Sequence, residues 1–280
     1  MPRWIAFNMN YLEYFFFKHS YWSHWRRLGL DPEYPPQPAC ASIEITTSNE
    51  KQIMISTQIS VNNSKQTRIF RTTVVYTFCC DGSVKISSTV SPEIPLSRLS
   101  SLPRIGFSFA LRKNLSSISY SGRGPHESYQ DRKTSSEFGI WSTTPNSMGY
   151  RYIVPCENGN RSNCNWVLFR RPCLTRHKQI SENTFIPNYR KQALVIVAAK
   201  EGNEQENTIS PDFHFSALLH NQIELHHATH THQLDDRQDG AHPIFCSIDS
   251  HQMGLGGDVG WSPCVYDDFL LRPNETYTSR

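Results

Sequence analysis

The sequence predicts an all-β protein built from antiparallel strands, and three observations lead to this fold class. Short runs rich in β-branched and aromatic residues alternate with polar residues over much of the chain. Glycine, proline, asparagine and serine interrupt these runs at short intervals. Only one stretch carries the signals of a helix. Such a pattern is typical of antiparallel sheets packed face to face, with one or two short helices.

The strand candidates begin at residues 53–61, where apolar side chains recur with a period of two and so lie on one face of a strand. Residues 69–78 and 84–90 follow, and the Asp81-Gly82 pair between them predicts a β-hairpin. Further strand candidates are residues 105–111, 165–169, 193–199, 212–218, 244–249 and 266–271.

The one predicted helix follows Asn221, which can cap it while Glu224 reaches back in a capping box. No repeat or flexible linker divides the rest of the chain, so we expect one β-sandwich domain over residues 41–280. Residues 1–40 form an aromatic and proline-rich segment that joins this domain in part. Within that segment, residues 31–40 are expected to be an extended connector.

Composition narrows the classes of function. The 280 residues include 28 Lys and Arg against 25 Asp and Glu, a net charge of +3, which gives little support to a nucleic-acid partner. We find no signal peptide and no apolar run that could span a membrane. The eight cysteines are scattered without a Cys-x-x-Cys pair, which favours reduced thiols. These features predict a cytoplasmic protein.

A histidine-rich stretch at residues 226–232 is the first candidate for a metal site, because closely spaced imidazoles can converge on zinc. The stretch straddles a helix end and a loop, and it lacks the spacing that places two ligands on one helical face. The sequence therefore favours the absence of a metal site and implies no cofactor in this chain. The histidines concerned are His226, His227, His230 and His232.

Two glutamates, Glu127 and Glu157, lie in polar, turn-rich stretches, and a pair of carboxylates could serve glycoside hydrolysis. In the alternative interpretation Glu127 belongs to a polar corner between strands, because buried charges are usually paired. The other members of this corner would be Arg123, Asp131 and Arg132. The sequence favours the structural interpretation, and we assign no catalytic residue.

Trp261 lies in a stretch of four glycines, residues 254–265. A rigid aromatic ring beside glycines offers a stacking surface for the C–H face of a sugar. A tryptophan packed in the core beneath the loop is the alternative, because tryptophan is highly buried on average. Both interpretations stay open on these residues alone.

Four stretches carry a resemblance to a known family. They are residues 102–111, 120–132, 152–161 and 248–263. Their motifs are Gly-x-Gly-Pro-x-Glu-x-Tyr-x-Asp-Arg from Gly122, Pro-x-Glu-Asn-Gly-x-Arg from Pro155, and Met-Gly-x-Gly-Gly-Asp-x-x-Trp from Met253. From about Tyr21 onward the chain resembles the C-terminal small-chain domain of the large β-galactosidases of glycoside hydrolase family two.

The resemblance implies a galactose-mutarotase-like β-supersandwich. It also implies carbohydrate binding, in which the domain completes an active site for the hydrolysis of terminal β-D-galactosides in carbohydrate metabolism. In this family the loop that matches residues 253–261 reaches toward a neighbouring barrel domain, and its tryptophan is a platform for the sugar. The expected substrate-binding residues are therefore Trp261 and Asp258.

The family's catalytic machinery has no counterpart here. Its two catalytic glutamates and its magnesium and sodium or potassium sites belong to other domains, and a barrel needs about 250 residues. We therefore expect the chain to be inactive alone and to act with an upstream barrel domain or its homo-oligomer. The alternatives are a stand-alone carbohydrate-binding or assembly module, and an aldose mutarotase-like epimerase with a His/Glu acid-base pair.

Overall fold

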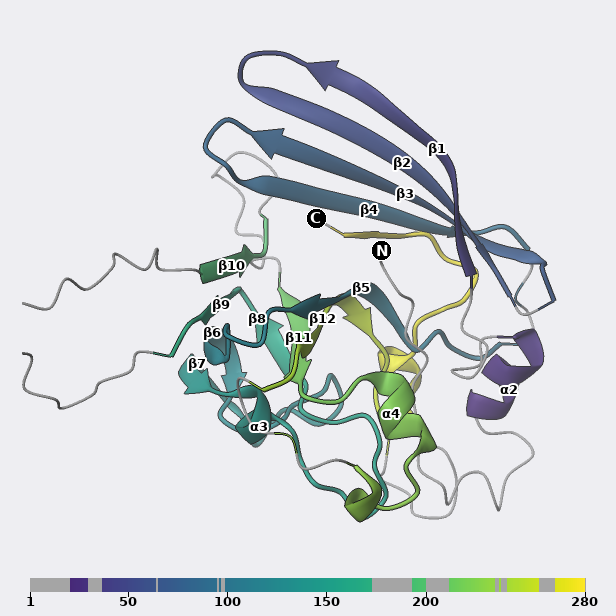
Figure 1. Ribbon diagram of the computed structural model, residues 1–280. Helices are drawn as coiled ribbons and strands as arrows, with labels where there is room; N and C mark the ends of the chain where they lie inside the picture. The colour runs from purple at the N-terminus through teal and green to yellow at the C-terminus, as the bar shows by residue number, and fades with distance from the viewer. Residues whose placement is uncertain are drawn as a thin grey trace, which may run out of the picture.

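The strands pair into three antiparallel sheets, and Figure 1 shows one of them as a layer above the other two. The computed structural model describes residues 21–29, 37–63, 65–94, 96, 99–172, 193–199, 212–234, 237, 241–256 and 265–279. The all-β antiparallel class expected from the sequence is confirmed.

The upper sheet has five strands in the order β1-β2-β3-β4-β13. The predicted strands at residues 53–61 and 69–78 form most of β2 and β3, and the predicted hairpin joins β3 to β4. At its turn Gly82 has a φ of 84°, and Ser83 N donates to Asp81 Oδ1 at 2.8 Å. The strands are β1 Gln37–Ser48, β2 Gln52–Asn62, β3 Arg68–Cys79, β4 Val84–Pro92 and β13 Tyr277–Ser279.

The two other sheets have four strands each, in the orders β10-β9-β6-β7 and β5-β12-β11-β8. Five of these strands match predicted ones: β5 Arg104–Leu111, β9 Trp166–Arg170, β10 Ala193–Val197, β11 Phe213–Leu218 and β12 Ile244–Gln252. The other three strands were not predicted, because serine, glycine or asparagine interrupts any apolar pattern in their sequences. They are β6 Ser117–Gly124, β7 Glu137–Thr143 and β8 Arg161–Cys164.

The prediction of a strand at residues 266–271 is wrong. Asp267–Phe269 form a 3-10 helix, η2, in which Phe269 N donates to Tyr266 O at 2.8 Å. Two adjacent aspartates disfavour a strand and favour such a turn. Of the predicted strand, Leu271 alone makes a β-bridge, to Leu102.

The connector expected at residues 31–40 ends earlier than predicted, because β1 begins at Gln37. β1 lies at the edge of the five-stranded sheet, with β2 as its neighbour. A proline that lacks an N–H donor is tolerated on such an edge, which explains how Pro38 enters the strand.

Three short α-helices lie among the described residues, against the one or two expected from the sequence: α2 Tyr21–Leu28, α3 Pro145–Met148 and α4 Gln222–His227. α4 is the helix expected from the sequence, and its capping box is present. Asn221 Oδ1 accepts from Glu224 N at 2.9 Å, and Glu224 Oε2 accepts from Asn221 N at 2.8 Å. In the described part of the chain, no helix combines the length and the apolar character needed to cross a membrane.

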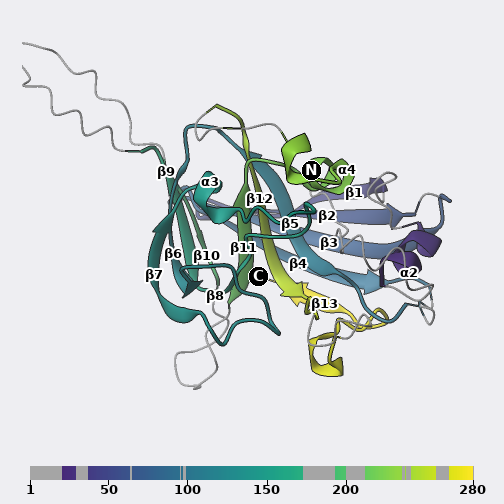
Figure 2. The ribbon, with the colours of Figure 1, turned by 90° about the horizontal axis from the view of Figure 1, so that it is seen from below.

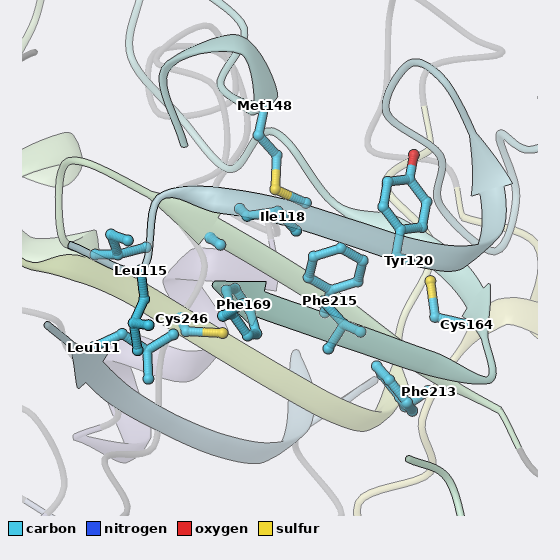
Figure 3. Close-up of a cluster of buried hydrophobic side chains, with 13 residues drawn as sticks. Leu111, Leu115, Ile118, Tyr120, Met148, Cys164, Phe169, Phe213, Phe215 and Cys246 are labelled. Atoms are coloured by element: carbon cyan, nitrogen blue, oxygen red, sulfur yellow. The ribbon is translucent and has the colours of Figure 1, made fainter. Parts of the chain in front are cut away.

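Two apolar clusters hold the layers together. The first joins α2 and the five-stranded sheet to the residues around β5, and it includes Trp25, Val61 and Phe70. The second fills the space between the two four-stranded sheets, where the rings of Tyr120 and Phe215 meet edge to face at 5.1 Å between centroids (Figure 3). Burial of these side chains is the main stabilising contribution to the fold.

α2 contributes to the first cluster through Trp25, which is 1% exposed and donates from Nε1 to Ser101 O at 2.7 Å. Part of the N-terminal segment thus packs on the sandwich. The division of the chain at residues 40 and 41 remains a prediction.

Candidate functional site

The substrate-binding residues expected from the sequence, Asp258 and Trp261, lie outside the described residues. The structure describes the residues on either side of their loop. β12 ends at Gln252, residues 253–256 follow, and the description resumes at Val265. We call residues 253–256 together with Asp131 the loop anchor, because they fix the point where the glycine-rich loop leaves the sheet.

The loop anchor is built from close backbone contacts. Met253 is 1% exposed, and Gly254 N donates to Phe269 O at 2.8 Å. Gly256 has a φ of 70° and donates its N–H to Asp131 Oδ2 at 2.7 Å. A Cβ on Gly254 would lie 2.5 Å from the same carboxylate oxygen, so a glycine is required there. The start of the loop is therefore held by a charged acceptor at close range.

The first motif holds Asp131 in a tight turn. Tyr129 N donates to Arg132 O at 3.1 Å, and Arg132 N donates to Tyr129 O at 3.0 Å. The Arg132 guanidinium lies 5.3 Å from the centre of the Tyr129 ring and donates from Nη2 to Glu127 Oε1 at 2.6 Å. Each turn residue is thus fixed by its neighbours, which leaves the Asp131 carboxylate directed at the loop.

Glu127 connects the first motif with the second. Its Oε1 also accepts from the Tyr152 hydroxyl, and its Oε2 accepts from Gly159 N at 2.9 Å. Gly159 has a φ of 74°, a left-handed conformation that favours glycine. Burial, together with the hydrogen bond to Glu127, raises the pKa of Tyr152 to about 12.

A buried group of three charges lies behind the two motifs. Arg104 Nη2 is 2.8 Å from Glu157 Oε1, and Arg104 Nη1 is 3.3 Å from Asp249 Oδ2. All three side chains are 3% exposed. Burial raises the pKa of Asp249 to about 7, with Arg104 opposing the rise and Glu157 adding to it. The group ties β5, β12 and the second motif together.

Two more titratable side chains are buried beside this group. Tyr129 is fully buried, and burial followed by the negative charge of Glu157 raises its pKa well above the ordinary value. His214 accepts at Nε2 from the amide of Gln130 at 2.8 Å. Burial, with a smaller contribution from Arg104, lowers the pKa of His214 to about 3, so this imidazole is neutral in the folded protein.

The two glutamates singled out in the sequence have structural partners. Glu157 lies in the buried charge group, and Glu127 accepts hydrogen bonds from three groups. This geometry favours the structural interpretation over a pair of catalytic carboxylates. The expected pairing of Glu127 with Arg132 is present, whereas Arg123 donates to Ser136 O at 2.8 Å and Asp131 accepts from the loop.

Sequence reasoning missed Arg104 and Asp249. Each carried a signal, since a charged residue that directly adjoins an apolar strand needs a partner if it is buried with that strand. Arg104 opens the apolar run 105–111, and Asp249 closes the run 244–248. Their pairing required knowledge that β5 and β12 are neighbours, which the structure supplies.

The histidine-rich stretch spans α4 and the 3-10 helix η1, Thr231–Gln233. The rings of His226 and His227 lie 5.6 Å apart between centroids, and those of His230 and His232 lie 5.4 Å apart. Over the described ranges, no three or more His, Cys, Asp or Glu side chains are grouped so as to hold a metal ion. The expectation that this stretch binds no metal remains a prediction.

Comparison with known proteins places these motifs in a family. The family model described as "Beta galactosidase small chain" matches residues 8–280. A β-galactosidase of Vibrio cholerae is 30% identical over 260 residues, which is 92% of this chain and 21% of that protein. β-Galactosidases of Oenococcus oeni and Yersinia enterocolitica are 24% and 29% identical, over 91% and 90% of this chain.

The chain spans about a fifth of the length of the curated relatives it matches. The family match covers nearly the whole chain, including all three motifs that build the loop anchor and the contacts behind it. The chain belongs to the β-galactosidase small chain family.

Proposed function

We propose that this chain is the small-chain part of a β-galactosidase, in which it binds the sugar and completes an active site for the hydrolysis of terminal β-D-galactosides. The observation that carries the proposal is the loop anchor. The first and third motifs, which are distant in sequence, meet there through the hydrogen bond from Gly256 N to Asp131, and Glu127 joins the first motif to the second by accepting from Gly159 N. The lack of space for a side chain at Gly254 and the hydrogen bond from Gly256 to Asp131 fix the start of the loop, which supports a role in presenting the loop residues that follow.

Trp261 and Asp258 are the residues proposed to meet the substrate. Both follow Gly256 within five positions, so an anchored Gly256 limits the space that they can sample. A tryptophan ring stacks on the C–H face of galactose, and a carboxylate accepts hydrogen bonds from its hydroxyls.

The chemistry itself is proposed to come from a partner. Retaining hydrolysis needs a nucleophile and an acid/base glutamate, which the resemblance assigns to a barrel domain together with magnesium and sodium or potassium sites. Within the loop anchor and the charge group behind it, the described carboxylates are engaged by arginine or backbone groups. The chain is therefore expected to bind and to orient the substrate without reacting with it.

An uncovered apolar surface supports the need for a partner. One face of the five-stranded sheet carries the cross-strand row Ile53, Phe78 and Val84, whose side chains are 42%, 43% and 46% exposed. The same face is buried farther along β3, where Val74 and Phe70 are 0% and 7% exposed. A contiguous apolar face that continues the core into solvent is typical of an interface.

We also propose that the chain resides in the cytoplasm, which is a reducing compartment. The six described cysteines are free thiols. Burial raises the pKa of Cys156 to about 12, which makes this thiol unreactive at neutral pH. The described cysteines are Cys40, Cys79, Cys80, Cys156, Cys164 and Cys246.

The test is reconstitution with a fragment that supplies the barrel. The chain alone is expected to leave a chromogenic β-galactoside intact, and the mixture is expected to hydrolyse it. Trp261→Ala should lower kcat/KM at least tenfold, about 1.4 kcal/mol, and Trp261→Phe should lower it less because a stacking face remains. Tyr266→Ala is the matched control, since this exposed aromatic residue lies just beyond the loop.

Stability is measured on the same variants. Truncation of a core tryptophan costs about 3–5 kcal/mol, whereas a platform residue contributes little to folding. A Trp261→Ala variant that unfolds, or that keeps full activity in a working complex, contradicts the platform. Galactose binding by the chain in the absence of any productive partner would favour the stand-alone binding module.

A further inference from the structure

The apolar face of the five-stranded sheet extends beyond the single row of side chains described above. A second, adjoining row crosses four strands and is formed by Ile45, Ile55, Tyr76 and Ile86. Residues that stand opposite each other in the register of a sheet share one face of it. We call the two rows together the distal face. Its members are Ile45, Ile53, Ile55, Tyr76, Phe78, Val84 and Ile86.

The distal face is open, whereas the same face is closed at the other end of the strands. Ile45 and Ile86, which end the second row, are 68% and 39% exposed. Eight positions along β2 from Ile53, Val61 is 1% exposed and belongs to the first apolar cluster. The opposite face of β2 carries mainly serine, glutamine and asparagine. The apolar side chains are therefore confined to one face, as expected where a further layer covers it.

Residues 1–20 have the composition of a segment that covers such a face. Twelve of these twenty residues are apolar, including seven aromatic ones, and three are charged. The two other long stretches outside the described residues are more polar. Residues 173–192 contain six apolar and five charged residues, and residues 200–211 contain one apolar residue. Apolar side chains in the number found in residues 1–20 are stabilised by burial.

The described structure begins at Tyr21, at the covered end of the same face. Tyr21 packs against the first apolar cluster, and its ring lies 6.2 Å from that of Trp25 between centroids. α2 lies at the end of the sheet away from the turns that join β1 to β2 and β3 to β4 (Figure 1, and from below in Figure 2).

A segment that starts from this end is long enough to reach the distal face. From Val61 to Ile53, β2 covers about 26 Å at about 3.3 Å per residue. Twenty residues span about 30 Å as a helix and about 66 Å when extended. Residues 1–20 can therefore reach the distal face in either conformation.

We propose that residues 1–20 dock on the distal face in the isolated chain and shield its apolar side chains from water. The covalent link keeps the segment at a high effective concentration, which favours it over a second copy of the chain as the layer that covers this face. Because large apolar patches promote association, the docked segment also keeps the isolated chain from self-association. The proposed function gives this face to a partner, which then has to displace the segment. The docking in the isolated chain does not depend on that function.

Photo-cross-linking of the full chain tests the docking. The variant Phe16→benzoylphenylalanine keeps an aromatic ring and bonds to neighbouring C–H groups on illumination, and mass spectrometry locates the bond. The cross-links are expected within one chain, on the peptides of β2, β3 and β4 that carry the distal face. A mixture of isotopically light and heavy chains separates them from cross-links between two copies.

A charge on the distal face tests the location. Phe78→Asp places a carboxylate among apolar side chains, where an apolar segment cannot solvate it, so most of the intramolecular cross-links should be lost. Val84→Asp, at a side chain 46% exposed, tests the same face independently. Phe138→Asp is the matched control, because Phe138 is 58% exposed and lies in a different sheet, on β7. The melting temperature shows which variants fold.

The outcomes separate the possible occupants of the distal face. Intramolecular cross-links to the distal face that are lost in a folded Phe78→Asp or Val84→Asp variant and kept in Phe138→Asp support the proposal. Cross-links between two copies alone indicate that a second chain covers the face, and they overturn it. Cross-links confined to other parts of the chain, no cross-links, or an equal loss in Phe138→Asp also overturn it.

Discussion

Replacing Asp131 is expected to release the start of the glycine-rich loop more than it destabilises the rest of the molecule. Its carboxylate accepts from Gly256 N at 2.7 Å. A hydrogen bond to a charged group contributes about 1.5–3 kcal/mol. Asp131→Ala removes the acceptor and should lower the free energy of unfolding by about 2–3 kcal/mol. Asp131→Asn keeps an oxygen acceptor of the same shape, so its loss should be about 1 kcal/mol.

Two measurements separate a local effect from a global one. Urea unfolding gives the change in stability, and amide hydrogen exchange at Gly256 reports the opening of the loop anchor. Exchange at Gly256 should accelerate in Asp131→Ala by more than the change in global stability accounts for. Asp268→Ala, a loss of an exposed carboxylate in η2, is the control. If the Gly256 amide keeps its protection in Asp131→Ala, Asp131 does not anchor the loop.

Three further predictions follow from the buried charges and the histidines. Arg104→Met leaves Glu157 and Asp249 buried without their arginine and should cost about 3–5 kcal/mol. The loss should be smaller at pH 5 than at pH 8, because Asp249, whose pKa burial raises to about 7, can then take up a proton; urea midpoints at the two pH values check this. The pKa of His214 is about 3 in the folded chain against about 6.5 unfolded, so below about pH 6.5 the unfolded chain binds a proton that the folded chain lacks. The contribution of neutral His214 to stability is therefore lost as the pH falls from about 6.5 toward 3. In a pH series, the urea midpoint should change less steeply with pH in His214→Gln than in the unaltered chain. A chelator should leave the melting temperature unchanged if the histidine-rich stretch holds no structural metal; a drop that zinc reverses would contradict this.

The strands were predictable where the local pattern is strong. Residues 53–61, 69–78 and 244–249 alternate or are rich in β-branched and aromatic residues, and each lies within a strand. β6 contains serine and glycine at the positions where strands normally carry larger side chains, so its sequence resembles a loop. It is a strand because β7 and β9 pair with it on both sides, and Gly122 is required where Cys164 packs against it.

The sequence pattern also did not predict how the burial of side chains changes along the five-stranded sheet. The alternation at residues 53–61 places Ile53 and Val61 on one face, yet Val61 is 1% exposed and Ile53 is 42% exposed. Periodicity assigns a side chain to a face of its own strand. It does not say how far along the strand a second layer covers that face.

The sequence by itself determined which residue types the site contains, because the three motifs, the glycines and the capping box of α4 are local patterns. It also determined the all-β class, since side-chain alternation follows from the geometry of a single strand. The tertiary structure alone decided which groups meet. Asp131 and Gly256 are 125 positions apart, and Arg104 finds Asp249 because β5 pairs with β12. Such contacts depend on the order and register of strands, which are set by the burial of the whole apolar surface and not by any one segment.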